Sequence, residues 1–337
     1  MVIPRREPGP RDVEIAITHC GLCHSDIDRA RELWGSTRFP IVPGHEIIGT
    51  VVATGSDVST HAVGDRVAVG CMVDSCGECI RCVEGLEQYC LRGNVQTYNW
   101  IGRDGQVTQG GYSDRVVVDE HFVLRVPASL SSAGAAPLLC AGVTMYSPLR
   151  HWNVGPTTRL GIIGLGGLGH VGVQIGAALG AEVTVLDLDE SKREDAIRLG
   201  ATDFRVATDP DAFTDLAESL DLIVSTVPAN LDYGAYLSLL TLDGTFVNVG
   251  VPSRPIEVAA FALISHRRSI AGTRTGSIRE TQEVLDFCAD HGIEAEVELV
   301  DATAIDESFD RMLAGDVRYR FVLETDTLTA PHGGARA

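Results

Sequence analysis

The stretch Leu160-Gly161-Ile162-Ile163-Gly164-Leu165-Gly166-Gly167-Leu168-Gly169 decides how the second half of the chain folds. Residues 159–163 predict a buried strand, and the pattern G-x-G-x-x-G follows it and opens a helix predicted over 164–179. Gly164 would make a tight turn, Gly166 would let the backbone approach a pyrophosphate, and Gly169 would let helix and strand pack closely. The stretch therefore predicts a dinucleotide site at a helix N-terminus, with Gly167 and Leu168 completing the loop.

The next predicted strand, residues 182–186, leads into Asp187, 23 positions after Gly164. An acidic residue at about this distance binds the adenosine ribose, and its charge repels a 2′-phosphate. Lys192 and Arg193 favour the opposite choice because either cation could meet a 2′-phosphate, although both could simply form an exposed first helical turn. We expect NAD as the cofactor and keep NADP as the alternative, with Asp187 and Lys192 as cofactor-binding candidates.

The character of the chain changes near residue 140, which predicts two domains of an α/β protein. In the first part, short alternating runs separated by glycine turns predict strands at 12–18, 47–54, 65–69, 113–118 and 122–126. In the second part, helices predicted at 138–152 and 191–199 alternate with strands at 159–163, 182–186, 221–226 and 245–250. This alternation predicts a parallel, doubly wound sheet. A final strand, 318–324, is expected to return to the first domain.

Four cysteines near residue 80 have the spacing C-x2-C-x2-C-x7-C; they are Cys76, Cys79, Cys82 and Cys90. Four thiolates this close suit one tetrahedral zinc whose positions are all filled by protein. Such a closed site binds no substrate, so we expect this zinc to be structural. Two disulfides or four scattered thiols are the alternative, and nothing else in the sequence is typical of a secreted protein.

Three further metal ligands are candidates although they lie apart in the sequence: Cys23, His45 and Cys140. Two cysteines and one histidine with an open fourth position are one of the ligand sets of catalytic zinc. Taken singly, Cys140 could be a core thiol and His45 an ordinary loop residue.

The composition limits the classes of partner. The formal net charge is −19, and no basic cluster stands out, so we expect no nucleic acid. No apolar run reaches the ~20 residues of a membrane-spanning helix. Residues 1–10 are charged and proline-rich without an apolar signal region. We therefore expect a cytoplasmic protein that does not bind membranes and whose reduced thiols can hold metal.

Together these motifs resemble those of the zinc-dependent medium-chain alcohol dehydrogenases, and more narrowly of the cinnamyl alcohol dehydrogenase branch. The resemblance covers nearly the whole chain. It includes residues 21–26, Pro43-Gly44-His45-Glu46, the four-cysteine lobe, Gln109-Gly110-Gly111-Tyr112, residues 136–142, 164–170, Glu280-Thr281-Gln282-Glu283 and residues 316–321.

The resemblance implies a GroES-like, β-rich catalytic domain over residues 1–138 and 280–337, with the structural zinc lobe at 74–91. It implies a Rossmann domain over 139–279 and a homodimer built through the Rossmann domains around 245–274. It also implies two zinc ions per chain and reversible hydride transfer between a primary alcohol and a nicotinamide cofactor.

By the same resemblance, Cys23, His45 and Cys140 hold the catalytic zinc, and Glu46 is an occasional ligand beside them. Asp26 would orient His45 through its other ring nitrogen. When bound, zinc would lower the pKa of the alcohol hydroxyl, and the nicotinamide would accept the hydride.

Ser25 would receive the substrate proton, and Thr144 would pack against the nicotinamide. Two positions depart from the family pattern. Asp28 stands where the proton relay usually ends at a histidine, so either this carboxylate or water takes the proton. Asp187 stands where the branch commonly has a small hydroxyl residue and prefers NADP.

The substrate pocket is less clear. Trp34, Trp100, Cys71 and Met72 are candidates for an apolar wall near the metal, although each tryptophan could equally serve ordinary packing. With such a wall, the small-molecule substrate would be an apolar or aromatic primary alcohol or its aldehyde. The resemblance implies an aromatic, allylic or medium-chain alcohol. The alternatives are a polyol dehydrogenase of the same superfamily, which needs a polar pocket, and a non-enzymatic zinc- and nucleotide-binding redox sensor.

Overall fold

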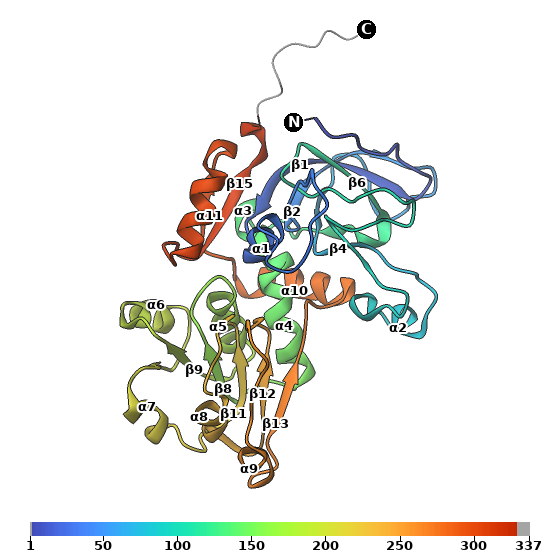
Figure 1. Cartoon of the computed structure of the whole chain (residues 1–337). Coiled ribbons are helices and arrows are strands. Elements are labelled where there is room, and N and C mark those ends of the chain that lie inside the picture. Colours follow the sequence, from blue (N-terminus) through green and yellow to red (C-terminus); the bar gives the residue numbers. More distant parts are fainter. Residues whose placement is uncertain (1, 329–337) are drawn as a thin grey trace. The chain divides into compact units, whose positions relative to one another are not determined.

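The computed structural model describes residues 2–328 and divides into two compact units. Unit 1 comprises residues 1–143 and 276–337, and unit 2 comprises residues 144–275 (Figure 1). The boundary at Val143 and Thr144 falls inside one helix, α4 (Ala141–His151). The part of the expected catalytic domain after residue 328 lies outside the described residues. No helix among the described residues is long and apolar enough to cross a membrane.

Unit 1 is built on a seven-stranded sheet in the order β14-β15-β1-β2-β3-β7, with β6 paired to β1. Its strands are β1 (Asp12–Gly21), β2 (Ile47–Thr54), β3 (Arg66–Val69), β6 (Arg115–Asp119), β7 (Leu124–Arg125), β14 (Val297–Val300) and β15 (Arg320–Glu324). A separate two-stranded sheet joins β4 (Met72–Asp74) to β5 (Val95–Gln96).

Strand β1 organises unit 1 because it has three partners. It pairs with β2 along most of its length, with β6 over its first half and with β15 over its last three residues. Alternate residues Val13, Ile15 and Ile17 enter the same apolar core, as expected for a strand with one buried face. Because β15 comes from the end of the chain, the expected return of the last strand to the first domain is confirmed.

The helices of unit 1 are α1 (His24–Ala30), α2 (Ile80–Val83), α3 (Ser132–Ala135), α10 (Ile278–His291) and α11 (Ile305–Leu313). Short 3-10 turns are η1 (Glu87–Tyr89), η2 (Glu120–Phe122), η3 (Ala136–Leu139), η5 (Ala302–Ala304) and η6 (Thr325–Thr327). Helix α11 lies along β15 (Figure 1), where Phe309 packs with Phe321 and Leu323 in one buried cluster.

Unit 2 contains six parallel strands in the order β10-β9-β8-β11-β12-β13. They are β8 (Arg159–Ile163), β9 (Glu182–Asp187), β10 (Asp203–Val206), β11 (Leu220–Ser225), β12 (Leu240–Asn248) and β13 (Ser269–Gly272). The order reverses at β8, and ligands of such sheets bind beyond the carboxyl ends of the strands at this reversal. The predicted doubly wound sheet is therefore confirmed, and the glycine stretch lies at its reversal point.

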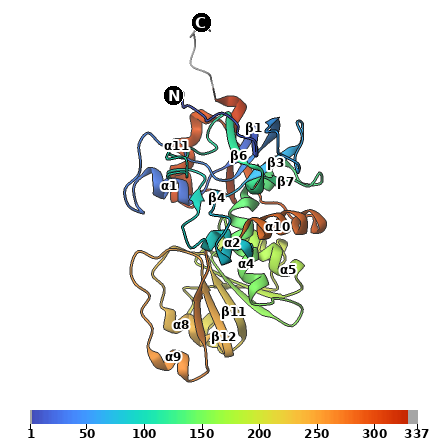
Figure 2. The same cartoon turned by 90° about the vertical axis from the view of Figure 1, so that its right-hand side faces the viewer.

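Helices cover both faces of this sheet, and Figure 2 shows α5 on one side and α8 on the other. On one face, the backbone of Gly176 in α5 lies against Leu160 and Val183. On the other, Tyr233 of α8 packs in a cluster with Ile163. The helices of unit 2 besides α4 are α5 (Gly169–Ala178), α6 (Arg193–Arg198) preceded by η4 (Glu190–Lys192), α7 (Pro210–Asp215), α8 (Tyr233–Ser238) and α9 (Ala260–Ile264).

Two predicted elements differ from the structure. The helix predicted over 138–152 is interrupted: η3 ends at Leu139, Cys140 leaves the helical region with φ −125° and ψ −66°, and α4 begins at Ala141. The strand predicted over 122–126 is instead the turn η2 followed by the short strand β7. The carboxylate of Asp119 caps that turn by accepting a hydrogen bond from the backbone N–H of His121, which favours a turn over a longer strand.

Candidate functional site

The four cysteines near residue 80 converge on one point in unit 1. Ligand atoms of Cys76, Cys79, Cys82 and Cys90 all lie within 4.8 Å of one another. The Sγ atoms of Cys76 and Cys82 are 3.8 Å apart, and those of Cys79 and Cys82 are 3.5 Å apart. Four sulfurs at ~2.3 Å from a tetrahedral zinc would lie ~3.8 Å from each other, so this donor set fits zinc.

The backbone around these cysteines favours thiolates. Sγ of Cys79 accepts hydrogen bonds from backbone N–H groups, first that of Leu91, and these lower the pKa of Cys79 to about 6. Sγ of Cys76 accepts the backbone N–H of Cys79 at 3.3 Å. A metal requires the deprotonated thiol, so these hydrogen bonds favour the metal-binding state of Cys79, whereas burial raises the pKa of Cys82 to about 12.

A second convergent cluster also lies within unit 1. Cys23, His45, Glu46 and Cys140 each place one ligand atom within 4.8 Å of the others. The hydrogen bond from Cys140 lowers the pKa of the Cys23 thiol well below its ordinary value. Two sulfurs, an imidazole and a carboxylate suit a zinc ion, and the carboxylate is the weakest donor of the four for this metal. The residue types therefore fit a metal that keeps one position for exchange.

The carboxylate of Asp26 joins the segments around this second cluster. It is completely buried and accepts four hydrogen bonds. Oδ1 accepts from His45 Nδ1 and from the backbone N–H of Gly44, both at 3.1 Å. Oδ2 accepts from the backbone N–H of Cys23 at 3.0 Å and from the Tyr112 hydroxyl at 3.1 Å. Because Nδ1 is engaged, Nε2 is the ring nitrogen of His45 that remains to bind a metal.

Glu46 has a buried cationic partner. The Arg320 guanidinium donates to both of its carboxylate oxygens, at 2.5 and 2.7 Å, and also to the carbonyl oxygen of Leu22. Burial raises the pKa of Glu46 to about 7, and the charge of Arg320 opposes this rise. The facing residue is glycine by necessity, because a Cβ atom on Gly21 would lie 1.9 Å from Oε2 of Glu46.

Ser25 and Asp28 lie on helix α1, beside the second cluster in sequence. The carbonyl oxygen of Ser25 accepts a hydrogen bond from the Tyr98 hydroxyl at 3.1 Å. The ring of Tyr98 lies 5.8 Å from that of His45, centroid to centroid. Asp28 is partly buried, and this burial raises its pKa above the ordinary value.

The four pocket candidates occupy different environments. Trp34 and Trp100 are 42% and 40% exposed, whereas Met72 is buried in the core of unit 1. The Cys71 thiol lies within hydrogen-bonding reach of Cys140, so it borders the second cluster. Their part in substrate binding stays a prediction.

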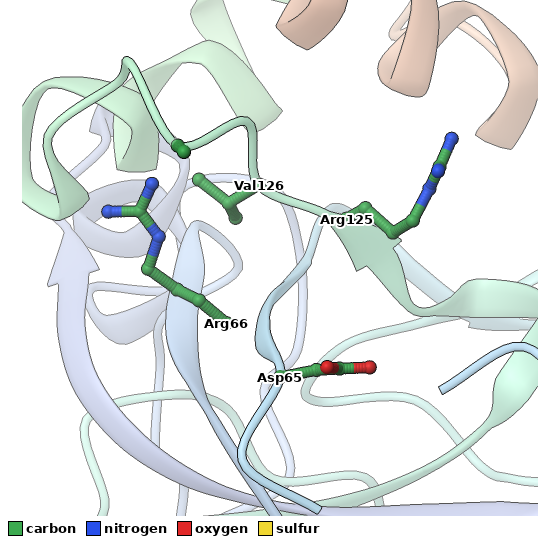
Figure 3. A pocket seen from close by; sticks show the side chains of 5 residues that line it. Asp65, Arg66, Arg125 and Val126 are labelled. Atoms are coloured by element: carbon green, nitrogen blue, oxygen red, sulfur yellow. The ribbon is translucent and has the colours of Figure 1, made fainter. Parts of the chain in front are cut away.

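A shallow pocket of about 390 Å³ lies elsewhere on unit 1 and contains none of the predicted site residues. Asp65, Arg66, Arg125, Val126 and Ala128 line it. Figure 3 shows the side chains of Arg66 and Arg125 directed away from each other, and Arg66 donates to the carbonyl oxygen of Pro127. The two cations therefore do not converge on a ligand.

The glycine loop of unit 2 has the geometry that a dinucleotide requires. Gly164 has a φ of +90°, the left-handed conformation that favours glycine. A Cβ atom on Gly169 would lie 1.9 Å from the carbonyl oxygen of Gly164, whereas one on Gly166 would meet no atom within 4 Å. Gly167 and Leu168 complete the loop before α5 begins at Gly169. The loop thus leaves open space at Gly166, where a pyrophosphate would approach.

Asp187 ends β9, and its buried carboxylate already accepts three hydrogen bonds. Oδ2 accepts from the backbone N–H of Leu165 at 2.6 Å and from Lys192 Nζ at 3.2 Å, and Oδ1 accepts from the backbone N–H of Asp189. Arg193 is bound elsewhere, to Glu190 and to a backbone carbonyl. Lys192, the only lysine of the chain, is therefore the cation beside Asp187.

Thr144, which was predicted to pack against the nicotinamide, lies buried in α4, at the start of unit 2.

Two tyrosines became apparent as residues of interest only in three dimensions. Tyr98 and Tyr112 border the second cluster, although sequence reasoning gave neither a role. The motif Gln109-Gly110-Gly111-Tyr112 was the available signal, since two adjacent glycines indicate a close approach of backbone.

Two protein-family models match the chain: the alcohol dehydrogenase GroES-like domain over residues 9–128 and the zinc-binding dehydrogenase over residues 167–290. NADP-dependent alcohol dehydrogenase C of Mycobacterium bovis is 56% identical over 326 residues, 97% of this chain and 94% of that protein. Aldehyde reductase YahK of Escherichia coli is 48% identical over 332 residues, 98% of this chain and 95% of that protein. A solved cinnamyl alcohol dehydrogenase of Sorghum bicolor has a TM-score of 0.93 and 42% identity, covering 96% of this chain and 93% of its own.

Metal analysis tests the two clusters. We expect about two zinc ions per purified chain, and about one in Cys140→Ala, because only the second cluster loses a thiolate. Cys288→Ala is the matched control, since this buried cysteine belongs to neither cluster and the variant should keep both ions. Elemental analysis after gel filtration measures the content, and an unchanged zinc content in Cys140→Ala would exclude that ligand.

Two glycine substitutions test the loop of unit 2. Gly169→Ala should lower the free energy of unfolding by about 1–3 kcal/mol because the new methyl group meets a backbone oxygen. Gly166→Ala should leave that free energy nearly unchanged but weaken dinucleotide binding at least ~10-fold. Denaturant unfolding and nucleotide titration measure the two effects, and equal binding by Gly166→Ala and the unmodified protein would refute the assignment.

Proposed function

This chain belongs to the zinc-binding alcohol dehydrogenases, and we propose that it interconverts apolar or aromatic primary alcohols and their aldehydes. It is an alcohol dehydrogenase and aldehyde reductase that uses zinc and a nicotinamide cofactor. The observation that carries the proposal is the second cluster, in which Cys23, His45 and Cys140 meet the ion-paired Glu46.

The composition of that cluster supports catalysis over a purely structural role. Three strong donors leave one position for substrate, and the fourth donor, Glu46, is held by Arg320. When bound there, zinc supplies the electrophile that polarises an alcohol or aldehyde oxygen. The protein's own part is to hold His45 through Asp26 and to keep the Cys23 thiolate charged.

The proposed substrate class rests on relatives. One relative is named an aldehyde reductase, and a solved structure similar over nearly the whole chain is titled a cinnamyl alcohol dehydrogenase. Cinnamyl alcohol is therefore a suitable first substrate for oxidation, with a polyol such as sorbitol, oxidised under the same conditions, as the contrast. A turnover ratio that favoured the polyol would overturn the proposed class.

We propose that the cofactor site admits both NADH and NADPH. Asp187 favours NADH, because a buried carboxylate repels the 2′-phosphate. Lys192 offsets this repulsion, since its ammonium lies 3.2 Å from that carboxylate and can turn to a phosphate. A relative 56% identical to this chain is named NADP-dependent, which supports a role for Lys192.

Paired substitutions test this division of roles. Asp187→Ser should raise the NADPH-over-NADH preference about 10-fold, and Lys192→Gln should lower it by a similar factor, since each removes about one unit of charge beside the phosphate. Dissociation constants from fluorescence titration measure the preference without turnover. Arg193→Gln is the control, because Arg193 is bound to Glu190. A Lys192→Gln variant that loses both cofactors equally would contradict the proposal.

We propose that Asp28 accepts the proton that leaves Ser25 during alcohol oxidation. The two residues are three positions apart on α1 and therefore lie on one helical face. Burial raises the pKa of Asp28, so its carboxyl group stays protonated to a higher pH than usual. A protonated carboxyl accepts no further proton, so alcohol oxidation should slow as the pH falls through this raised pKa.

The variant Asp28→Asn tests this path. Alcohol oxidation should fall at least ~10-fold, and imidazole in the buffer should restore part of it, because an external base can replace a missing one. Asp28→Glu should keep most of the rate. An Asp28→Asn enzyme with full activity at every pH would assign the proton to water instead.

We also propose a homodimer formed through unit 2. Strand β13 is one of the two edges of the parallel sheet, and Phe261 and Ile264 of the preceding helix α9 are 76% and 63% exposed. Exposed strand edges and exposed apolar side chains are typically buried when two chains associate. Light scattering should give the mass of two chains for the unmodified protein and the mass of one chain for Phe261→Asp. An unmodified protein with the mass of one chain would contradict the proposal.

A further inference from the structure

The motif Gln109-Gly110-Gly111-Tyr112 lies against the loop that carries His45. Three backbone hydrogen bonds join the two segments: Gly110 to the carbonyl oxygen of Val42 at 2.6 Å, Gly111 to that of Gly44 at 2.9 Å, and Tyr112 to that of Pro43 at 3.0 Å. The side-chain amide oxygen of Gln109 accepts the backbone N–H of Val42 at 2.7 Å.

The two glycines are required by this close approach. A Cβ atom on Gly110 would lie 2.3 Å from the carbonyl oxygen of Pro43, and one on Gly111 would lie 2.4 Å from the side chain of Ile47. Side chains at these positions would push the two segments apart. The glycines therefore bring Tyr112 close to the His45 loop.

The side chain of Tyr112 then reaches the carboxylate that orients His45. A Cβ atom on Gly44 would lie 2.7 Å from the Tyr112 ring, so the ring packs directly on that backbone. Its hydroxyl donates to Oδ2 of Asp26, while Oδ1 of Asp26 accepts from His45 Nδ1. Asp26 is completely buried, so bulk water does not reach its carboxylate. Removal of the Tyr112 hydroxyl would therefore leave one hydrogen bond of the carboxylate unmade, which is energetically costly.

We propose that Tyr112 is a positioning residue for the catalytic metal site and acts on His45 through Asp26. With the hydroxyl present, two donors fix each carboxylate oxygen, and the plane of the carboxylate is determined. Without it, Oδ2 keeps the backbone N–H of Cys23, and the nearby Tyr98 hydroxyl donates to the carbonyl oxygen of Ser25. The carboxylate is then held less firmly, and so is the imidazole that it orients. Hydrogen-bond partners of metal-binding histidines typically change metal affinity by ~10–100-fold when removed. This inference rests on the proposed zinc at the second cluster.

The experiment measures zinc release from the whole enzyme to a chromogenic chelator in excess. The four-cysteine lobe provides an internal reference, because its zinc is held by residues that do not contact Tyr112. The release phase that disappears in Cys140→Ala belongs to the second cluster. Tyr112→Phe should accelerate this phase about 10-fold and leave the other phase unchanged.

Two further variants separate positioning from general packing. Tyr233→Phe removes another buried tyrosine hydroxyl, in unit 2, and should change neither phase. In an Asp26→Asn background, Tyr112→Phe should add little to the release rate, because the pathway through the carboxylate is already lost.

Three outcomes would overturn the inference: an unchanged release rate in Tyr112→Phe, equal acceleration of both phases, or additive effects of Tyr112→Phe and Asp26→Asn. A parent protein with only one zinc, held in the four-cysteine lobe, would instead refute the proposed function itself. The two failures are therefore distinguishable.

Discussion

The second metal cluster of unit 1 depends on one buried carboxylate. Asp26 accepts donors from the start of α1, from the loop at Gly44 and from the segment that carries Tyr112. A buried charge is stable only when hydrogen bonds replace its hydration, so each donor is under a strong constraint. Because these segments are far apart in the sequence, the same carboxylate also fixes how they pack together around His45.

The two metal clusters differ in how the chain assembles them. The four-cysteine cluster is local, and backbone N–H groups of its own loop donate to the sulfurs. The second cluster draws Cys23, His45 and Cys140 from three distant segments, and its remaining donor is a carboxylate already paired with Arg320. A local, closed donor set stabilises a lobe, whereas a dispersed set with one weak donor allows exchange with a substrate.

Sequence patterns predicted the local features and two distant ones, the convergence of Cys23, His45 and Cys140 and the return of the last strand to unit 1, but they missed others. The sheet of unit 2 and the glycine loop follow from short periodic signals, because strand, turn and helix are adjacent in the chain. The break at Cys140 was not predicted, since a run of apolar residues is equally consistent with one uninterrupted helix. The role of Tyr112 depends on contacts across 86 positions with Asp26, which no periodicity encodes. The same holds for the choice between NAD and NADP. The sequence identified both Asp187 and Lys192, but only the structure shows that they form an ion pair.

The central claim is that the second cluster holds a metal with a position open to substrate, and the first cluster holds one without. Cobalt substituted for zinc reports this directly, because its visible absorption depends on its ligands. We predict that an enzyme with cobalt only in the second cluster changes its absorption saturably when cinnamaldehyde is added, while cobalt only in the four-cysteine lobe gives no change. An aldehyde-insensitive spectrum from the second cluster, in an enzyme that still reduces the aldehyde, would contradict the account.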